Sequence, residues 1–174
     1  MAFVLAEAVE ILQRTPSVVR ALLWDLSDPW TRANTEPNGW SPFDVVGHLI
    51  HGEETDWIPR LRIILAHGDA RPFDPFDREA QFLNSKGKTL HQLIQRFAAL
   101  RAENLKILAG LNLTPAQMQL RGRHPALGTV TVEQLLATWT THDLTHLAQI
   151  SRVMAKRYAT PVGPWKQYIG VLQR

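Results

Sequence analysis

Cysteine is absent from the 174-residue sequence. Disulfide bonds, zinc–thiolate clusters, cysteine nucleophiles and protein-thiol redox chemistry are therefore excluded. Long apolar runs are also missing, since none approaches the roughly 18 residues of a membrane-spanning helix. The N-terminal stretch has no basic segment and carries Glu7 among its apolar residues, unlike a secretory signal peptide. These absences predict a cytoplasmic protein without a membrane partner.

The sequence has little excess charge of either sign. Nineteen Lys and Arg residues face 16 Asp and Glu residues, which gives a net charge of +3 when the histidines are neutral. The basic residues are scattered rather than clustered or interleaved with aromatic residues, so we expect no nucleic-acid partner. The hydrophobic content of 45% is typical of a globular protein. The length predicts one domain over residues 1–174 with a core that needs no disulfide.

Several helix starts are marked by a hydroxyl side chain followed by proline, whose missing N–H has no partner in the first turn of a helix. Such pairs occur at Thr15-Pro16, Ser41-Pro42 and Thr114-Pro115. Two further segments, Thr89-x-x-Gln92 and Thr131-x-x-Gln134, are typical of capping boxes. Between these signals the apolar residues recur with helical period. The predicted long helices are 3–26 (with a break or kink at Thr15-Pro16), 42–67, 89–110 and 131–157.

The segment 68–87 is polar and contains Pro72 and Pro75, so we expect it to be a long crossover loop. A short turn at 115–120 and a C-terminal piece from Pro164 complete the chain. No stretch has the alternating pattern of a convincing strand. Four long helices with one long connection predict an all-α, up-and-down four-helix bundle with one long crossover.

Histidine is the residue type most able to carry chemistry here, with seven copies in the chain. His67 stands before a glycine at a predicted helix end, and His91 lies in the first turn of another helix. Both are typical of surface positions. His142 and His146 instead occupy the middle of an apolar seam on the last long helix. Because residues four apart share one helix face, this pair suits two ligands of a single metal ion better than two hydrogen-bonded core histidines.

The segment 142–146 is similar to the metalloprotease motif H-E-x-x-H, but Asp143 is one methylene shorter than the glutamate of that motif. Residues 147–174 also contain no Asp, Glu or His, so a third ligand must come from upstream. The upstream candidates are His48, His51, His124 and the carboxylates of the second long helix. Glu53 lies on the apolar stripe of that helix, which makes it a candidate buried carboxylate behind the ligands. Periodicity does not choose between His48 and His51.

Three segments of the chain resemble the DinB-like superfamily of helical bundles. They are Trp40-Ser41-Pro42-Phe43-Asp44-Val45-Val46-Gly47-His48-Leu49, Gly122-x-His124-Pro125-x-x-Gly128-x-Val130-Thr131 and Thr141-His142-Asp143-Leu144-Thr145-His146-Leu147-Ala148-Gln149-Ile150. The superfamily includes YfiT-like metal-dependent hydrolases and thiol-dependent transferases. The resemblance implies a divalent metal, zinc or nickel, bound by His48, His142 and His146. It also implies a homodimer.

Three neutral imidazoles leave coordination positions open, which is typical of a catalytic metal site. The resemblance implies that this catalyst is a metal-dependent hydrolase or low-molecular-weight-thiol transferase with a small-molecule substrate. Gln149 is expected to contact a ligand or the substrate, or to form a simple interhelical hydrogen bond. His124 is a candidate for the pocket mouth, and Asp143 should face solvent or a neighbouring helix. The alternative is a non-catalytic, stress-associated protein with a structural or regulatory metal, whose site would be closed to solvent.

Overall fold

The computed structural model describes residues 2–36 and 39–173. Its elements, in chain order, are α1 (Leu5–Leu23), α2 (Asp28–Thr31), α3 (Pro42–Thr55), α4 (Trp57–His67), α5 (Ala80–Ser85), α6 (Leu90–Gly110), α7 (Pro115–Met118), β1 (Arg121–His124), β2 (Gly128–Thr131), α8 (Val132–Lys156), and the 3₁₀ turns η1 (Gly163–Tyr168) and η2 (Gly170–Leu172). None of the helices within these residues is long and apolar enough to cross a membrane.

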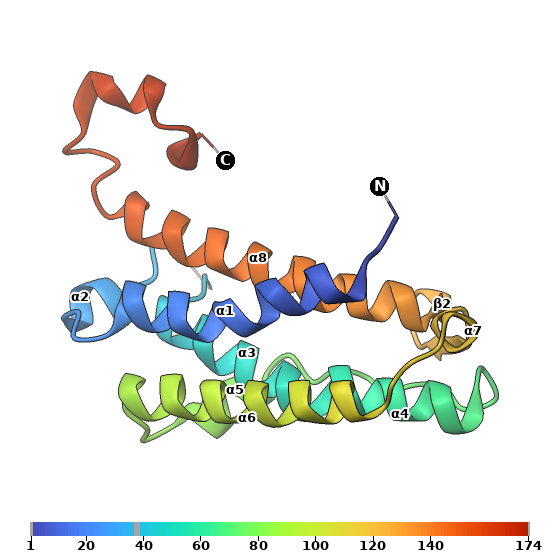
Figure 1. Cartoon of the computed structure of the whole chain (residues 1–174). Helices are drawn as coiled ribbons and strands as arrows, with labels where there is room; N and C mark the ends of the chain where they lie inside the picture. Colours follow the sequence, from blue (N-terminus) through green and yellow to red (C-terminus); the bar gives the residue numbers. More distant parts are fainter. Residues whose placement is uncertain (1, 37–38, 174) are drawn as a thin grey trace.

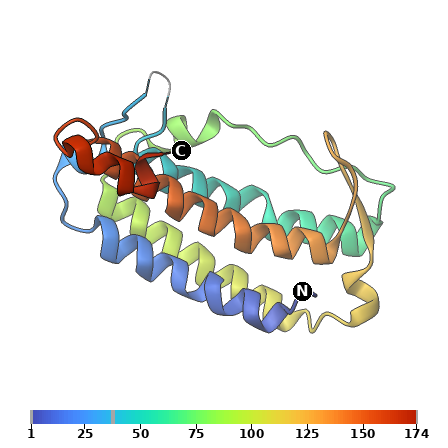
Figure 2. The same ribbon diagram turned by 90° about the horizontal axis from the view of Figure 1, so that it is seen from above.

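Four long helical units form a bundle, and α3 and α4 together make one of them (Figure 1). Helix α6 packs against α1 and α3, while α8 packs against α1, α3 and α4. The predicted four-helix bundle is confirmed. Its helix directions are up, down, down, up rather than alternating, because α3–α4 and α6 run the same way (Figure 1). Parallel neighbours need a connection that returns along the bundle, and the predicted crossover provides it (Figure 2).

The predicted helix starts at Ser41, Thr89 and Thr131 are confirmed. Each side chain accepts a hydrogen bond from the backbone N–H three residues later, and each forms a complete capping box. Thr114 caps α7 in the same way. Such reciprocal bonds satisfy two backbone N–H groups that would otherwise have no partner at a helix start.

The helix predicted over 42–67 is divided at Asp56, whose backbone separates α3 from α4. Pro59 explains the division. Its nitrogen cannot donate to the Thr55 carbonyl, and its ring crowds that carbonyl. Asp56 and Trp57, at the division, line the cavity described below.

Of the break or kink predicted at Thr15-Pro16, the break is wrong, since α1 continues through Pro16. Proline at this position leaves the carbonyl of Leu12, four residues earlier, without its helical N–H donor. Nη1 of Arg101, from α6, donates to that carbonyl at 2.8 Å instead. A contact from a distant helix thus compensates for the bond that proline removes.

The crossover contains a short helix that the sequence did not predict, α5, which packs on α3. The antiparallel strands β1 and β2 were also not predicted, because four residues each are too few to show a period. This hairpin holds the crossover in place, since the Phe73 N–H donates to the Arg123 carbonyl at 2.9 Å. The crossover and the hairpin therefore form one continuous rim beside α4 and α8.

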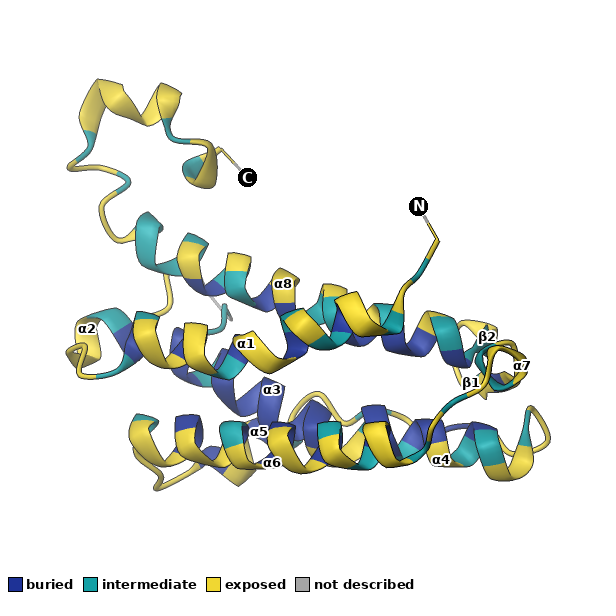
Figure 3. Ribbon diagram, in the orientation of Figure 1, coloured by how far each residue is buried: buried dark blue, intermediate teal, exposed yellow. Residues whose placement is uncertain are grey.

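The buried residues face the axis of the bundle along its whole length (Figure 3). One apolar cluster centres on α3 and α6, and a second joins α4, α6 and the start of α8. The C-terminal segment after α8 lies apart from this core and is largely exposed (Figures 1 and 3). Polar and charged side chains are also buried in the bundle, in addition to these two apolar clusters.

Candidate metal centre

His48 enters the bundle interior from α3, and only 8% of the residue is exposed. The preceding residue, Gly47, lets α5 approach α3 closely, because an added Cβ would lie 2.5 Å from Oγ of Ser85. This approach covers the part of α3 that carries His48. The imidazole also packs against the rings of Trp40 and Phe76, with centroids 4.7 and 5.4 Å away.

His142 and His146 face His48 from α8, one helical turn apart. Nε2 of His142 lies 3.0 Å from Nε2 of His48 and 3.1 Å from Nε2 of His146. One nitrogen from each of the three rings lies within 4.8 Å of the other two. The structure thus brings together the three histidines that the resemblance implied.

Hydrogen bonds between neutral imidazoles cannot account for both of these short nitrogen–nitrogen contacts. Nε2 of a neutral imidazole either donates one hydrogen bond or accepts one in the ring plane. Nε2 of His142 has two nitrogen neighbours at hydrogen-bond distance, those of His48 and His146. It can form a good hydrogen bond with only one of them, so at the other contact two lone pairs or two N–H groups would face each other. A cation among the rings is attracted by all three lone pairs at once. The donor set therefore fits a metal ion.

The surroundings keep these imidazoles neutral. Burial lowers the pKa of His48 to about 4 and the pKa of His142 to about 2, and His146 adds repulsion to both. Burial also lowers the pKa of His146, although Gln149 and Asp143 oppose the shift. At neutral pH the nitrogens therefore have lone pairs available for a metal without first losing protons.

His51 does not join the cluster, although it lies on the same helix as His48. Its ring is buried beside Phe76, with centroids 4.7 Å apart. Neither of its ring nitrogens has a hydrogen-bond partner among the described residues. Of the two histidines that periodicity left open, the structure places His48 at the cluster.

Two further sequence candidates lie close to the cluster. Gln149 contacts one of its members, with Oε1 2.7 Å from Nδ1 of His146, so Nδ1–H donates to the amide oxygen and Nε2 keeps a lone pair for a metal. His124 lines the same cavity as the three histidines, and its Nδ1 accepts bonds from the backbone N–H groups of Ala126 and Leu127 at 3.1 Å. His124 therefore lies at the hairpin rim, as expected for the pocket mouth.

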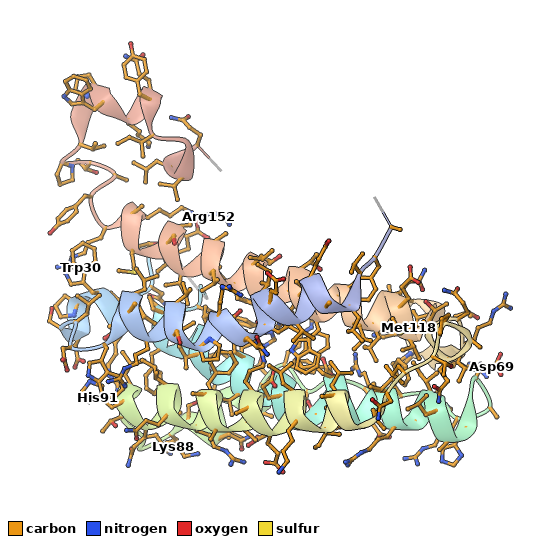
Figure 4. The ribbon with its side chains drawn as sticks, in the orientation of Figure 1. Trp30, Asp69, Lys88, His91, Met118 and Arg152 are labelled. Atoms are coloured by element: carbon orange, nitrogen blue, oxygen red, sulfur yellow. The ribbon has the colours of Figure 1, made fainter. Side chains whose placement is uncertain are left out.

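The remaining histidines lie away from the site, as predicted. His91 is exposed at the start of α6, where it stacks on Trp24 and contacts Asp25 at 3.1 Å. Figure 4 shows His91 at the end of the bundle near Trp30, while Asp69, just beyond His67, lies at the opposite end. His67 is exposed as well.

Glu53 is buried, as its place on the apolar stripe indicated, but its side chain forms its hydrogen bonds with residues other than histidine. Its Oε1 accepts bonds from Arg101 and from Nε1 of Trp139, and its Oε2 accepts one from Asn104. Arg101 also forms a two-pronged ion pair with Asp143, at 2.6 and 2.9 Å. Asp143 thus faces a neighbouring helix rather than solvent.

This network contains two carboxylates and one guanidinium, all fully buried. Burial alone would lower the pKa of Arg101, but Asp143 and Glu53 outweigh burial and raise it. Arg101 and the role of Asp143 were not predicted from the sequence. A signal was available for Arg101, because it lies on the apolar stripe that continues from Phe97 to Leu108. An arginine at a core position of one helix and Glu53 at a core position of another predict a buried ion pair.

A cavity of about 720 Å³ opens onto the three histidines. Its aromatic walls come from the crossover, from α4 and from the segment before α3, and are formed by Trp40, Trp57, Phe73 and Phe76. Asp56 and Arg60 also line it and pair with each other at 2.8 Å. Burial raises the pKa of Asp56 to about 6, against the opposing effect of Arg60. The volume and the apolar walls are those of a small-molecule site.

Comparisons with known proteins agree with this architecture. The family model of the DinB superfamily matches residues 11–150. No curated protein matches the chain. Among solved structures, YfiT from Bacillus subtilis, described as a probable metal-dependent hydrolase with an unusual four-helix bundle topology, aligns with a TM-score of 0.75 and 20% identity over 87% of this chain and 86% of its own. That likeness shows a shared fold. Because the family match covers most of the chain, the protein belongs to the DinB superfamily.

Proposed function

We propose that His48, His142 and His146 bind a divalent metal ion, zinc or nickel. We further propose that the protein is a metal-dependent enzyme that acts on a small molecule in the adjoining cavity. Its reaction would be hydrolysis or the transfer of a low-molecular-weight thiol. The observation that carries the proposal is the convergence of three uncharged imidazole nitrogens at the wall of an open cavity.

The nitrogen separations support binding of a single ion. Two nitrogens that bind one ion at about 2.1 Å lie about 3.0–3.4 Å apart. The separations of 3.0 and 3.1 Å fall in this range. Three histidines would leave at least one coordination position for water or substrate.

The charge beneath the histidines also supports a cation. The network of Glu53, Arg101 and Asp143 has one more negative than positive group, and Asp143 follows His142 directly on α8. The Asp143 carboxylate favours positive charge at His146. The same carboxylate would favour a divalent ion bound to that ring, against Arg101, which disfavours positive charge at His142.

Both reactions would depend on the bound ion and on residues of this chain. When bound, a divalent ion would polarise a substrate carbonyl or lower the pKa of a water or thiol. Because the chain has no cysteine, any thiol must be a separate small molecule. Gln149 would orient the ring nitrogens of His146. Trp40, Trp57 and Phe76 would keep the reacting groups between aromatic walls.

The cavity favours a substrate with an apolar body and one negative group. The aromatic and aliphatic walls suit a ring or short chain. Asp56 and Arg60 neutralise each other, which leaves Arg78 as the lining arginine without an ion pair among the described residues. Arg78 is exposed at the crossover rim, where it can meet an anionic group of an entering molecule.

The test compares metal-free protein with protein reconstituted with zinc or nickel. Both are assayed for hydrolysis of aryl esters and for conjugation of a small thiol to an aromatic electrophile. We expect one of the two activities to require the metal and to disappear in His146→Ala but not in the exposed control His67→Ala. Stoichiometric metal with neither activity would instead support the non-catalytic alternative. The openness of the cavity to the histidines favours the enzyme.

We also propose that the chain is one domain and that it forms a cytoplasmic homodimer. The C-terminal segment supports dimerisation, because Trp165 and Tyr168 are 71% and 77% exposed in the single chain. Large aromatic side chains at such exposure are typical of protein interfaces. Light scattering after gel filtration should give the mass of a dimer for the wild type and of a monomer for Trp165→Asp. A monomeric wild type would contradict the dimer.

A further inference from the structure

The β1–β2 hairpin forms one wall of the cavity that opens onto the three histidines, and His124 lies at the end of β1. The other hairpin residues on this wall are apolar: Pro125, Ala126, Leu127 and Val130. Nδ1 of His124 accepts hydrogen bonds from the backbone N–H groups of Ala126 and Leu127, both at 3.1 Å. A nitrogen that accepts must carry the lone pair, so the ring proton of the neutral imidazole is on Nε2.

The Nε2–H group of His124 has no partner within residues 2–36 and 39–173. The hydrogen bonds of the ring are the two at Nδ1. Nε2 is not one of the buried unpartnered atoms either, so it is open to a ligand. Because the two ring nitrogens point away from each other, Nε2–H is directed away from the turn that Nδ1 holds. The cavity wall therefore carries a hydrogen-bond donor whose tautomer is fixed.

The hairpin that carries this donor is held by two other elements. On α4, the side chain of Ile64 packs so closely that a Cβ added at Gly122 would lie 2.5 Å from its Cγ1. On the crossover, the N–H of Phe73 donates to the Arg123 carbonyl at 2.9 Å. The ring of Phe73 also stands edge-on to the imidazole of His124, with centroids 6.1 Å apart. A donor held in place before binding loses little conformational freedom when a ligand arrives.

The neighbouring polar side chains on this wall already have partners. Arg60 and Asp56 form an ion pair at 2.8 Å. The Thr138 hydroxyl donates to the Gln134 carbonyl at 2.7 Å, and the Gln134 side chain completes the capping box of α8. A hydrocarbon placed against His124 would remove water from Nε2–H without replacing it, which costs free energy. A ligand with an acceptor oxygen at this place avoids that cost.

Closing the hairpin turn does not require an imidazole. Asn and Asp make such bonds to nearby backbone N–H groups with a shorter side chain. His124 makes the same bonds and adds Nε2–H. Burial and Arg60 lower the pKa of His124, so the ring is uncharged at neutral pH. An uncharged donor suits a carbonyl, ester or ether oxygen, and it rejects an ammonium group because Nε2 has no lone pair to offer.

This donor lies away from the three-histidine cluster. The hairpin packs on the start of α8, and Gln134, Thr138 and His142 line the cavity at intervals of one helical turn. At ~1.5 Å per residue, this wall runs about 12 Å from Gln134 to His142. A substrate that reaches both the hairpin and the cluster must therefore be elongated.

We propose that His124 is a specificity-determining residue whose Nε2–H donates a hydrogen bond to an uncharged acceptor oxygen of an elongated substrate, at the end remote from the metal-binding histidines. The inference rests on the proposed function, which makes the cavity the substrate site. It narrows the substrate class to molecules with an apolar body and a carbonyl, ester or ether oxygen at the far end.

The test uses metal-free, full-length protein and two ligands of the same shape. One is a biphenyl carboxylate with an acetyl group at the far end of its second ring. The other has an isopropenyl group there, so that CH₂ replaces the carbonyl oxygen. Dissociation constants are measured by calorimetric titration, and stability is measured by thermal unfolding.

Two substitutions separate the functions of the two ring nitrogens. His124→Asn keeps an acceptor near the position of Nδ1 and removes Nε2–H. His124→Gln keeps an N–H donor near the position of Nε2 and removes the acceptor that closes the turn. His67→Asn, at the exposed end of α4, is the control.

We expect the preference for the acetyl over the isopropenyl ligand to fall about 3- to 10-fold in His124→Asn, because one hydrogen bond contributes that much. Its melting temperature should stay that of the wild type. His124→Gln should keep the wild-type preference and melt at a lower temperature, and His67→Asn should change neither quantity. A role in the turn alone would not separate ligand preference from stability in this way.

An unchanged preference in His124→Asn would overturn the proposal. So would equal losses of preference in His124→Asn and His124→Gln, because they would mean that the shape of the turn alone matters, and so would a wild type that binds neither ligand. Nitrogen-15 chemical shifts test the wild type without any substitution: they should show the ring proton of His124 on Nε2, and a proton on Nδ1 would contradict the proposal.

These measurements are independent of the metal. A protein that prefers the acetyl ligand but binds no ion would refute the proposed function and leave the role of His124 standing. A metal-dependent enzyme whose preference is unchanged in His124→Asn would refute the role of His124 alone.

Discussion

Acid should destabilise the metal-free protein because its buried histidines resist protonation. The pKa of His48 is about 4 and that of His142 about 2 in the folded state. Both would be about 6.5 in the unfolded chain. Lowered pKa values mean that the folded state binds fewer protons than the unfolded state, so stability is fully present above about pH 6.5 and falls as the pH decreases. At about pH 5 each group contributes a loss of ~2 kcal/mol, since 1.5 pH units at ~1.36 kcal/mol each separate that pH from the unfolded pKa.

The two histidines together predict a loss of ~4 kcal/mol between about pH 7.5 and pH 5, and Asp56, whose pKa is raised to about 6 in the folded state, offsets ~1.4 kcal/mol of it. Urea unfolding of chelator-treated protein at several pH values measures the net loss. His142→Gln removes one titrating group, so its loss over the same range should be ~2 kcal/mol smaller than that of the wild type, while the exposed control His67→Gln should match the wild type. If His142→Gln loses as much stability as the wild type, or if the wild type loses less than ~1 kcal/mol, the rings are not held neutral by burial.

Three other changes have expected outcomes. Arg101→Met leaves two buried carboxylates without their cation and should lower the free energy of unfolding by ~3–5 kcal/mol in urea titration; a change below ~1 kcal/mol would contradict the buried network. Gly122→Ala places a Cβ 2.5 Å from Cγ1 of Ile64 and should destabilise by ~1–3 kcal/mol, whereas Gly110→Ala, with open space around it, should not lower the melting temperature. Arg78→Gln should weaken binding of an aryl carboxylate to metal-free protein about tenfold and leave its neutral alcohol analogue unchanged, as followed by tryptophan fluorescence; equal effects on both ligands would remove Arg78 from substrate recognition.

The helix starts could be predicted from the sequence because capping is local. Ser41, Thr89 and Thr131 each bond within three residues, so no distant contact affects the outcome. The two prolines inside helices show the limit of such rules. Pro59 divides its helix as the local rule requires, whereas α1 continues through Pro16, and a guanidinium from another helix bonds to the carbonyl that Pro16 leaves without a donor. Sequence patterns do not show which distant residue will do this.

The same contrast between local and distant contacts applies to the residues of the candidate site. The pairing of His142 with His146 follows from helix geometry, because residues four apart share one face. The choice of His48 over His51 depends on where α8 crosses α3, which no period within one helix encodes. The resemblance to a known family supplied that choice, and the structure brings His48 to the pair. The buried arginine network was missed for the same reason, since its partners come from three separate helices.

Calorimetric titration of chelator-treated protein with zinc or nickel tests the central claim most directly. We predict one ion per wild-type chain, and none in His48→Ala, His142→Ala or His146→Ala, each of which should remain folded by circular dichroism. His51→Ala, one turn from His48 on the same helix, should keep the wild-type stoichiometry. A wild type that binds no ion, or stoichiometric binding by His48→Ala with its loss in His51→Ala, would contradict the three-histidine metal centre.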